Sequence, residues 1–194
     1  MKPGPDKSFD PDIALSAATA VFKAHGFEGA SMSELTAAMG IGKKSLYDTF
    51  GNKRALFQQC VHAYAVENAA NFRALLLESG SSRENLRKLL SKFVDMHADD
   101  CSHGCLLGSC MADFDANDAN EVEFLKSALE QLENVFFDAF AQARSQGEIS
   151  NQVDPRSAAR LLICFTQGAA LVGRTAVGRE YLAQSYKQLE EILL

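Results

Sequence analysis

The sequence predicts an all-α fold of about nine helices. The chain has only four prolines in 194 residues, many alanines, leucines, glutamates and glutamines, and few valines or isoleucines. This composition favours helices over strands. Apolar residues also recur at intervals of three and four positions along most of the chain, and residues that begin or end helices separate these periodic segments.

The first helix is predicted from Pro11 to about His25. Asp10 is a typical N-cap, Pro11 suits the first helical position, and Gly26 is a typical terminator. One apolar stripe is expected to face a small core, and it consists of Ile13, Ala14, Ala17, Ala18, Val21 and Phe22.

A second helix follows at residues 32–39. Ser31 and Glu34 have the spacing of a capping box, and Gly40 supplies the left-handed residue that ends the helix. A third short helix is predicted at residues 43–50. Two short helices around a glycine-containing turn are typical of the helix-turn-helix motif.

The third helix has the composition of a DNA-recognition helix. Leu46 and Phe50 are expected to anchor it, which leaves cations and hydroxyls for phosphates and base edges. We predict that the residues facing DNA are Lys43, Lys44, Ser45, Tyr47 and Thr49.

Six further helices are predicted, beginning with a long one that Asn52 caps. We expect a boundary there, with residues 1–52 forming a helix-turn-helix DNA-binding domain and residues 53–194 a second, helical domain. Cys60 and Cys164 are expected to face helical cores, as are Leu161, Leu162, Phe165, Ala169 and Val172. The predicted helices span residues 53–77, 82–98, 105–114, 121–145, 155–176 and 180–192.

The N-terminal residues, about 9–57, resemble the DNA-binding signature of TetR-family transcriptional regulators. Gly42 and Asp48 depart from its usual form, and the anionic Asp48 is expected to modify the contacts with DNA. The residues that carry the resemblance are Gly26, Phe27, Ser31, Met32, Leu35, Thr36, Ala38, Met39, Gly40, Ile41, Leu46, Tyr47, Phe50, Asn52 and Lys53.

The resemblance implies a dimeric repressor that binds a palindromic double-stranded operator and is released by a small-molecule effector. It also implies that Lys53 and the start of its helix grip a phosphate, and that the last two long helices pair with their mates. Small residues allow such close approach, although they fit packing within one subunit equally well. They are Ala158, Ala159, Gly168, Ala169, Ala170 and Gly173.

The distribution of charge along the chain, and the motifs that the sequence lacks, limit the classes of function that are possible. The net charge is −6, but residues 1–55 carry +1 and residues 56–194 carry −7, and four of the N-terminal cations lie between Lys43 and Arg54. Such clustering is what phosphate binding requires. No apolar run is long enough to span a bilayer, no catalytic motif is present, and no cofactor or metal is predicted. We therefore expect a cytoplasmic regulator that is not an enzyme.

Large apolar and adaptable side chains in the second domain are candidates for an effector cavity. The alternative is that each belongs to an ordinary core. The candidates are Phe72, Phe93, Met96, His97, Met111, Phe114, Phe137 and Phe165.

The cysteines suggest an alternative input. Cys105 is expected at the start of a helix, where the helix dipole favours the reactive thiolate, and Cys101 or Cys110 would be its resolving partner. A thiol-based redox or electrophile sensor is therefore the alternative function. The competing interpretation is that all five cysteines are small buried hydrophobic residues.

Overall fold

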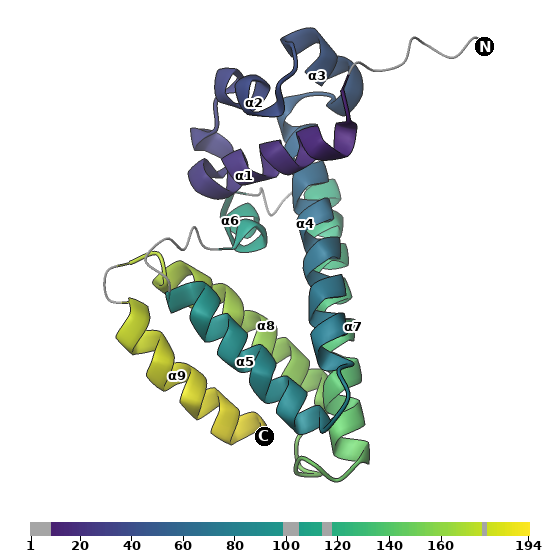
Figure 1. Cartoon of the computed structure of the whole chain (residues 1–194), viewed down its shortest axis with the longest axis vertical. Coiled ribbons are helices and arrows are strands. Elements are labelled where there is room, and N and C mark those ends of the chain that lie inside the picture. Colours follow the sequence, from purple (N-terminus) through teal and green to yellow (C-terminus); the bar gives the residue numbers. More distant parts are fainter. Residues whose placement is uncertain (1–8, 99–104, 114–117, 176–177) are drawn as a thin grey trace, which may run out of the picture. The chain divides into compact units, whose positions relative to one another are not determined.

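A computed structural model describes residues 9–98, 105–113, 118–175 and 178–194. Over these residues the chain is helical, with no strand, as the sequence predicted. It divides into two compact units, Met1–Tyr64 and Ala65–Leu194, so the division falls inside the fourth helix (Figure 1). Among the described helices, none combines the length and hydropathy that crossing a membrane requires.

The first unit contains α1 (Pro11–Gly29), α2 (Met32–Met39), α3 (Lys43–Phe50) and the start of α4 (Lys53–Leu76). The predicted N-cap of α1 is confirmed, because the Asp10 carboxylate accepts from the Asp12 amide at 2.8 Å. The helical path breaks at Gly26, where φ is +72° and ψ is −179°. Only glycine adopts this conformation readily. A further turn then runs to Gly29.

The predicted ends of α2 are also confirmed. The Ser31 hydroxyl accepts from the Glu34 amide at 3.1 Å, and the Glu34 carboxylate accepts from the Ser31 amide at 2.9 Å. Hydrogen bonds from the Ser31 side chain and from the Ser31 amide to the Glu34 carboxylate lower the pKa of Glu34. Their stabilisation is complete above the unfolded pKa of Glu34 and is lost as the pH falls through the folded pKa. Gly40 ends the helix with φ of +66°.

An aromatic cluster forms the core of the first unit. The rings of Phe22 and Phe57 lie 4.9 Å apart, and that of Phe27 lies 5.1 Å from Phe57. Leu46 and Phe50 of α3 are buried, as predicted. The prediction that Ile13 faces this core is wrong, because its side chain is 70% exposed. A helix with apolar residues on several faces does not reveal from its periodicity alone which face is covered.

The second unit contains the rest of α4 and α5 (Ser82–Ala98), α6 (Leu106–Asp113), α7 (Ala119–Ser145), α8 (Pro155–Val172) and α9 (Gly178–Leu193). Helices α5, α8 and α9 run side by side, and α7 packs on both α5 and α8 (Figure 1). Phe72 of α4, Phe93 of α5 and Phe136 of α7 meet with ring centroids 5.2–6.3 Å apart.

Ion pairs join neighbouring helices around this core. Glu133 of α7 receives Arg156 at 2.9 Å and Arg160 at 3.1 Å, both from α8. Arg87 of α5 donates to Glu190 of α9 at 2.6 Å. These ion pairs join α7 to α8 and α5 to α9 at the edge of the core.

Two predictions about α8 are wrong. Leu161 is 43% exposed and Cys164 is exposed, although both were expected to face the core. Buried residues on the same helix include Leu162 and Thr166, so the covered face is rotated from the predicted one. Because α8 is apolar on more than one side, its packing on α7, α9 and α5 determines which side is covered.

Glu148, in the turn between α7 and α8, caps α5 from far along the chain. Its carboxylate accepts from the Arg83 amide at 2.8 Å and from the Ser81 hydroxyl at 3.0 Å. The Ser81 hydroxyl itself accepts from the Glu84 amide, so Ser81 and Glu148 satisfy successive amides at the start of α5.

Glu148→Ala is expected to lower the free energy of unfolding by about 1–2 kcal/mol, because a charged acceptor of two hydrogen bonds is removed. Urea unfolding followed by circular dichroism measures the change. Glu148→Gln, which keeps one acceptor oxygen, should lose less. Equal stability of wild type and the alanine variant would mean that water replaces the carboxylate without cost.

Candidate nucleic-acid interface

Helix α3 presents an outward face of cations and hydroxyls. Lys43 and Lys44 are exposed and Tyr47 is 48% exposed, whereas Leu46 is completely buried. Two further residues predicted to face DNA, Ser45 and Thr49, are half-buried. The alternation follows from the helical period, because Leu46 and Phe50 lie four residues apart and anchor one side.

The N-terminus of α3 adds to its positive charge. Gly42 is the N-cap and has no side chain that accepts a hydrogen bond from the helix. The first amides of α3 therefore keep their donor capacity at the positive end of the helix dipole, beside Lys43 and Lys44. Such an end is suited to a phosphate group. Asp48 is exposed one turn further along and brings a negative charge to the same helix.

Lys53, the remaining residue predicted to bind DNA, begins α4. The Asn52 side chain caps this helix by accepting from the Ala55 amide at 2.8 Å. The Lys53 ammonium lies 4.6 Å from the centre of the Phe27 ring, and the Arg54 guanidinium lies 4.5 Å from it. Sequence reasoning missed this pairing, because Phe27 and Arg54 are far apart in the chain and neither residue type signals it alone.

The residues predicted to line an effector cavity lie in different surroundings. Phe72 and Phe93 are buried against one another, while Met96 is 37% exposed. Phe137 is half-buried under the Arg156 guanidinium at 4.1 Å, and Phe165 packs on Tyr186 at 4.8 Å. Met111 is half-buried. Phe114 and the side chain of His97 lie outside the described residues. The set stays a prediction.

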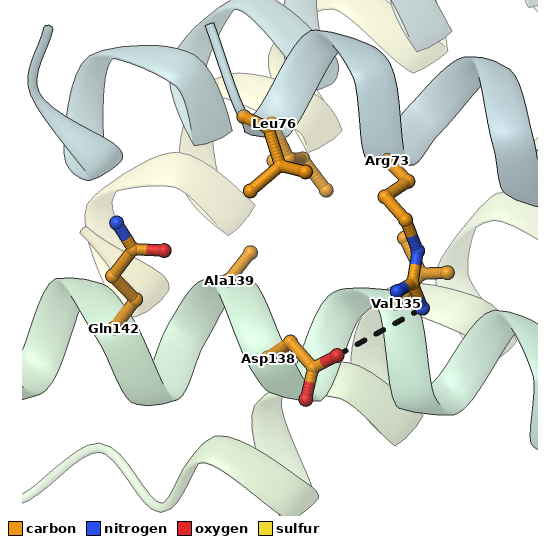
Figure 2. Close-up of a pocket in the computed structure, with 7 residues that line it drawn as sticks. Arg73, Leu76, Val135, Asp138, Ala139 and Gln142 are labelled. Carbon is orange, nitrogen blue, oxygen red and sulfur yellow. Dashed lines mark ion pairs between the residues drawn. The ribbon is translucent and has the colours of Figure 1, made fainter. Parts of the chain in front are cut away.

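A small cavity lies between α4 and α7. It is about 50 Å³ in volume, with Leu76, Val135 and Ala139 on its apolar walls and Gln142 nearby. Figure 2 shows Arg73 reaching across to Asp138, at 3.8 Å, beside it. Pockets for effector-sized molecules are about 300–1,000 Å³. The cavity as it stands is therefore too small for such a molecule.

The described cysteines differ in exposure. Cys60 and Cys110 are buried, Cys105 is half-buried and Cys164 is exposed. Cys105 directly precedes α6, which begins one residue later than predicted, whereas Cys101 lies outside the described residues. The exposed Cys164 thiol is accessible to reagents within a single chain.

Cys60 is expected to resist alkylation in the native protein at pH 8. Burial raises the pKa of its thiol to about 11, and a hydrogen bond with Thr19 offsets only part of that effect. The thiolate fraction at pH 8 is then about one in a thousand. Timed iodoacetamide labelling with peptide mass mapping tests this. Labelling as fast as in urea-unfolded protein would contradict it.

Two family models match the chain. The model described as bacterial regulatory proteins, tetR family, matches residues 14–60, which include α2 and α3. The model described as tetracyclin repressor-like, C-terminal domain, matches residues 82–189, more than half of the chain.

Individual proteins that are similar to this chain are also named as transcriptional regulators. The HTH-type transcriptional regulator YezE of Bacillus subtilis is 30% identical over 77% of both chains. The HTH-type transcriptional repressor ComR of Escherichia coli is 28% identical over 93% of this chain and 87% of its own.

Among solved structures, a cysteine-substituted variant of the TetR-family regulator CifR, complexed with 26-base-pair double-strand operator DNA, has a TM-score of 0.81. It is 26% identical to this chain, and the match covers 98% of this chain and 100% of that one. Taken with the helix-turn-helix geometry of α2 and α3, these matches show that the chain belongs to the TetR family of transcriptional regulators.

Proposed function

We propose that this regulator is a homodimeric repressor that binds a palindromic double-stranded operator through α3 and leaves it when a small-molecule effector binds the C-terminal unit. The observation that carries the DNA contact is the outward face of α3, with Lys43, Lys44 and Tyr47 exposed at a positive helix end. The CifR complex with operator DNA and the repressor ComR support the same role.

An exposed apolar face supports dimerisation. On α8, Leu161 is 43% and Leu171 is 53% exposed, and on α9 Tyr181 is 69% and Ile192 is 57% exposed. Spacings of three, four and three residues place Leu161, Cys164, Gly168 and Leu171 on one side of α8. A second copy of this chain would cover that side.

The small residues of α8 divide between two environments. Four of them, Ala158, Ala159, Ala169 and Ala170, are buried within the subunit, which agrees with packing inside one chain. Gly168 is exposed, and a Cβ atom added there would meet nothing within 4 Å. Gly173, which caps the end of α8, is half-buried, so Gly168 is the most exposed of the six small residues and the best placed to contact a partner.

Dimerisation gives the DNA contact its specificity. A single recognition helix buries too little surface for tight specific binding, whereas a dimer presents two such helices to successive major grooves about 34–36 Å apart. An effector that prefers a conformation with another spacing would shift the population away from the DNA-bound state.

Selection of bound fragments from genomic DNA tests this function. Purified protein should enrich a short inverted repeat, and the affinity for that repeat should fall steeply with salt concentration. A failure to enrich any sequence over bulk DNA would overturn operator binding. Genes beside the recovered site indicate the chemical class of effector to test next.

The thiol-based alternative rests on Cys105, which is half-buried and directly precedes α6. If oxidation of Cys105 is the input signal, mild peroxide alone would release the wild-type protein from DNA, and the Cys105→Ser variant would remain bound. Equal release of both proteins would remove Cys105 as the sensor, and release of neither would favour a ligand as the input.

A further inference from the structure

Two cations share one aromatic ring at the start of α4. The Lys53 Nζ and the Arg54 Cζ lie 4.6 Å and 4.5 Å from the centre of the Phe27 ring. Both distances are within the range in which the ring quadrupole attracts a cation. Lys53 and Arg54 are the first two residues of α4, so this positive charge is next to the positive end of the helix dipole.

The Phe27 ring is itself held in place. The break at Gly26 turns the chain, and the Phe27 ring packs 5.1 Å from Phe57 and 6.4 Å from Phe22. One guanidinium nitrogen of Arg54 is completely shielded from solvent. We therefore assign Arg54 to the support of the ring. Lys53 is the cation of the two that we expect to contact a phosphate.

The Lys53 side chain is restrained at a second point. Its ammonium donates a long hydrogen bond, 3.5 Å, to the backbone carbonyl of Glu28 near the end of α1. An ammonium has three donors, so this bond leaves others for a phosphate oxygen. A free lysine side chain loses considerable rotamer entropy when it binds, and one that is already ordered loses less.

We propose that Phe27 is a positioning residue for DNA binding, because its ring holds the Lys53 ammonium ready to meet an operator phosphate at the start of α4. This inference rests on the proposed function, in which Lys53 contacts DNA. Phe27 itself is not expected to touch the nucleic acid. Its effect is exerted entirely through Lys53.

A double-mutant cycle separates positioning from simple structural support. Phe27→Leu should weaken operator binding about threefold to tenfold and leave the salt slope unchanged, because Lys53 still neutralises a phosphate once bound. Lys53→Ala should weaken binding and reduce the magnitude of the slope by about two units per dimer. Combined with Lys53→Ala, Phe27→Leu should have no further effect on affinity.

Controls keep the test independent of folding. Phe27→Tyr retains the ring and should bind as wild type does, and thermal unfolding of each variant defines a temperature at which all are folded. In the wild-type protein without DNA, the Lys53 side-chain methylene protons next to the ammonium should show an upfield ring-current shift in the NMR spectrum.

The outcomes distinguish the two hypotheses. If Phe27→Leu weakens binding equally with and without Lys53, or if the Lys53 protons have random-coil shifts, Phe27 is only a core residue and the positioning role is wrong. If Lys53→Ala changes neither affinity nor slope, the Lys53 contact is absent and positioning fails with it. Operator binding through α3 is then judged separately, with variants of α3.

Discussion

Lys44→Ala is expected to weaken operator binding about tenfold to a hundredfold and to reduce the magnitude of the salt slope by about two units. Lys44 is exposed in the first turn of α3, where no side chain caps the helix. A dimer carries the substitution twice, so two phosphate contacts are lost together. Fluorescence anisotropy with labelled operator at several salt concentrations gives both quantities.

Tyr47→Phe separates the hydroxyl contact from the charge effect. The Tyr47 side chain is 48% exposed on the same face, and its hydroxyl is a neutral donor and acceptor. Its removal should lower specific affinity while leaving the salt slope unchanged, because no counterion is released by a neutral group.

Lys126→Ala is the matched control for the Lys44 variant. It makes the same charge change on an exposed lysine of α7 in the second unit, where Lys126 pairs at 3.7 Å with Glu123. If Lys126→Ala and Lys44→Ala reduce affinity and slope equally, net charge is responsible and α3 is not the recognition helix.

Local signals in the sequence predicted the helix-turn-helix well. The capping box at Ser31 and Glu34 and the left-handed Gly40 fix the ends of α2, and α3 begins and ends at the predicted residues. These features depend on hydrogen bonds between residues three or four positions apart. Both residues of such a pair can be recognised in the sequence from their types and their spacing.

Burial was harder to predict where a helix is apolar on several sides. Leu161, Cys164 and Ile13 are all exposed, although their spacing suited a core stripe. Which side is covered depends on distant partners, such as the Glu133 carboxylate that holds Arg156 and Arg160 of α8. Periodicity carries no information about partners of this kind.

Aromatic content likewise does not separate a cavity from a core. Phe72 and Phe93 were predicted to line an effector site, and in the structure they close on one another and on Phe136. The contacts of Phe27 with Lys53 and of Glu148 with α5 were missed for a related reason. Each joins segments whose separation in the sequence gives no sign that they meet.

The subunit contact of the proposed dimer can be tested at Gly168. Gly168→Leu is expected to convert the proposed dimer to a monomer and to reduce operator binding to the level of non-specific DNA. A Cβ atom added at this exposed position meets nothing within 4 Å in the subunit, so the variant should fold. Leucine is also a better helix former than glycine, by about 0.8–1 kcal/mol, and the subunit should not be destabilised. Only a contact with a partner is obstructed.

Sedimentation equilibrium at micromolar concentration measures the change, and Cys164 provides a second readout. It lies four residues before Gly168 on the same exposed side, so a partner should protect its thiol from alkylation and the variant should expose it. Leu171→Arg should act in the same direction by placing an unpaired charge in the apolar contact.

Leu77→Arg is the matched control, because Leu77 is 67% exposed but follows α4 and is not on α8 or α9. It should remain dimeric and bind operator as wild type does. A wild-type chain that sediments as a monomer would refute the dimer and the paired-groove mechanism together. A Gly168→Leu variant that stays dimeric, with Cys164 still protected, would mean that subunits meet elsewhere. In that case the exposure of Gly168 does not mark a subunit interface.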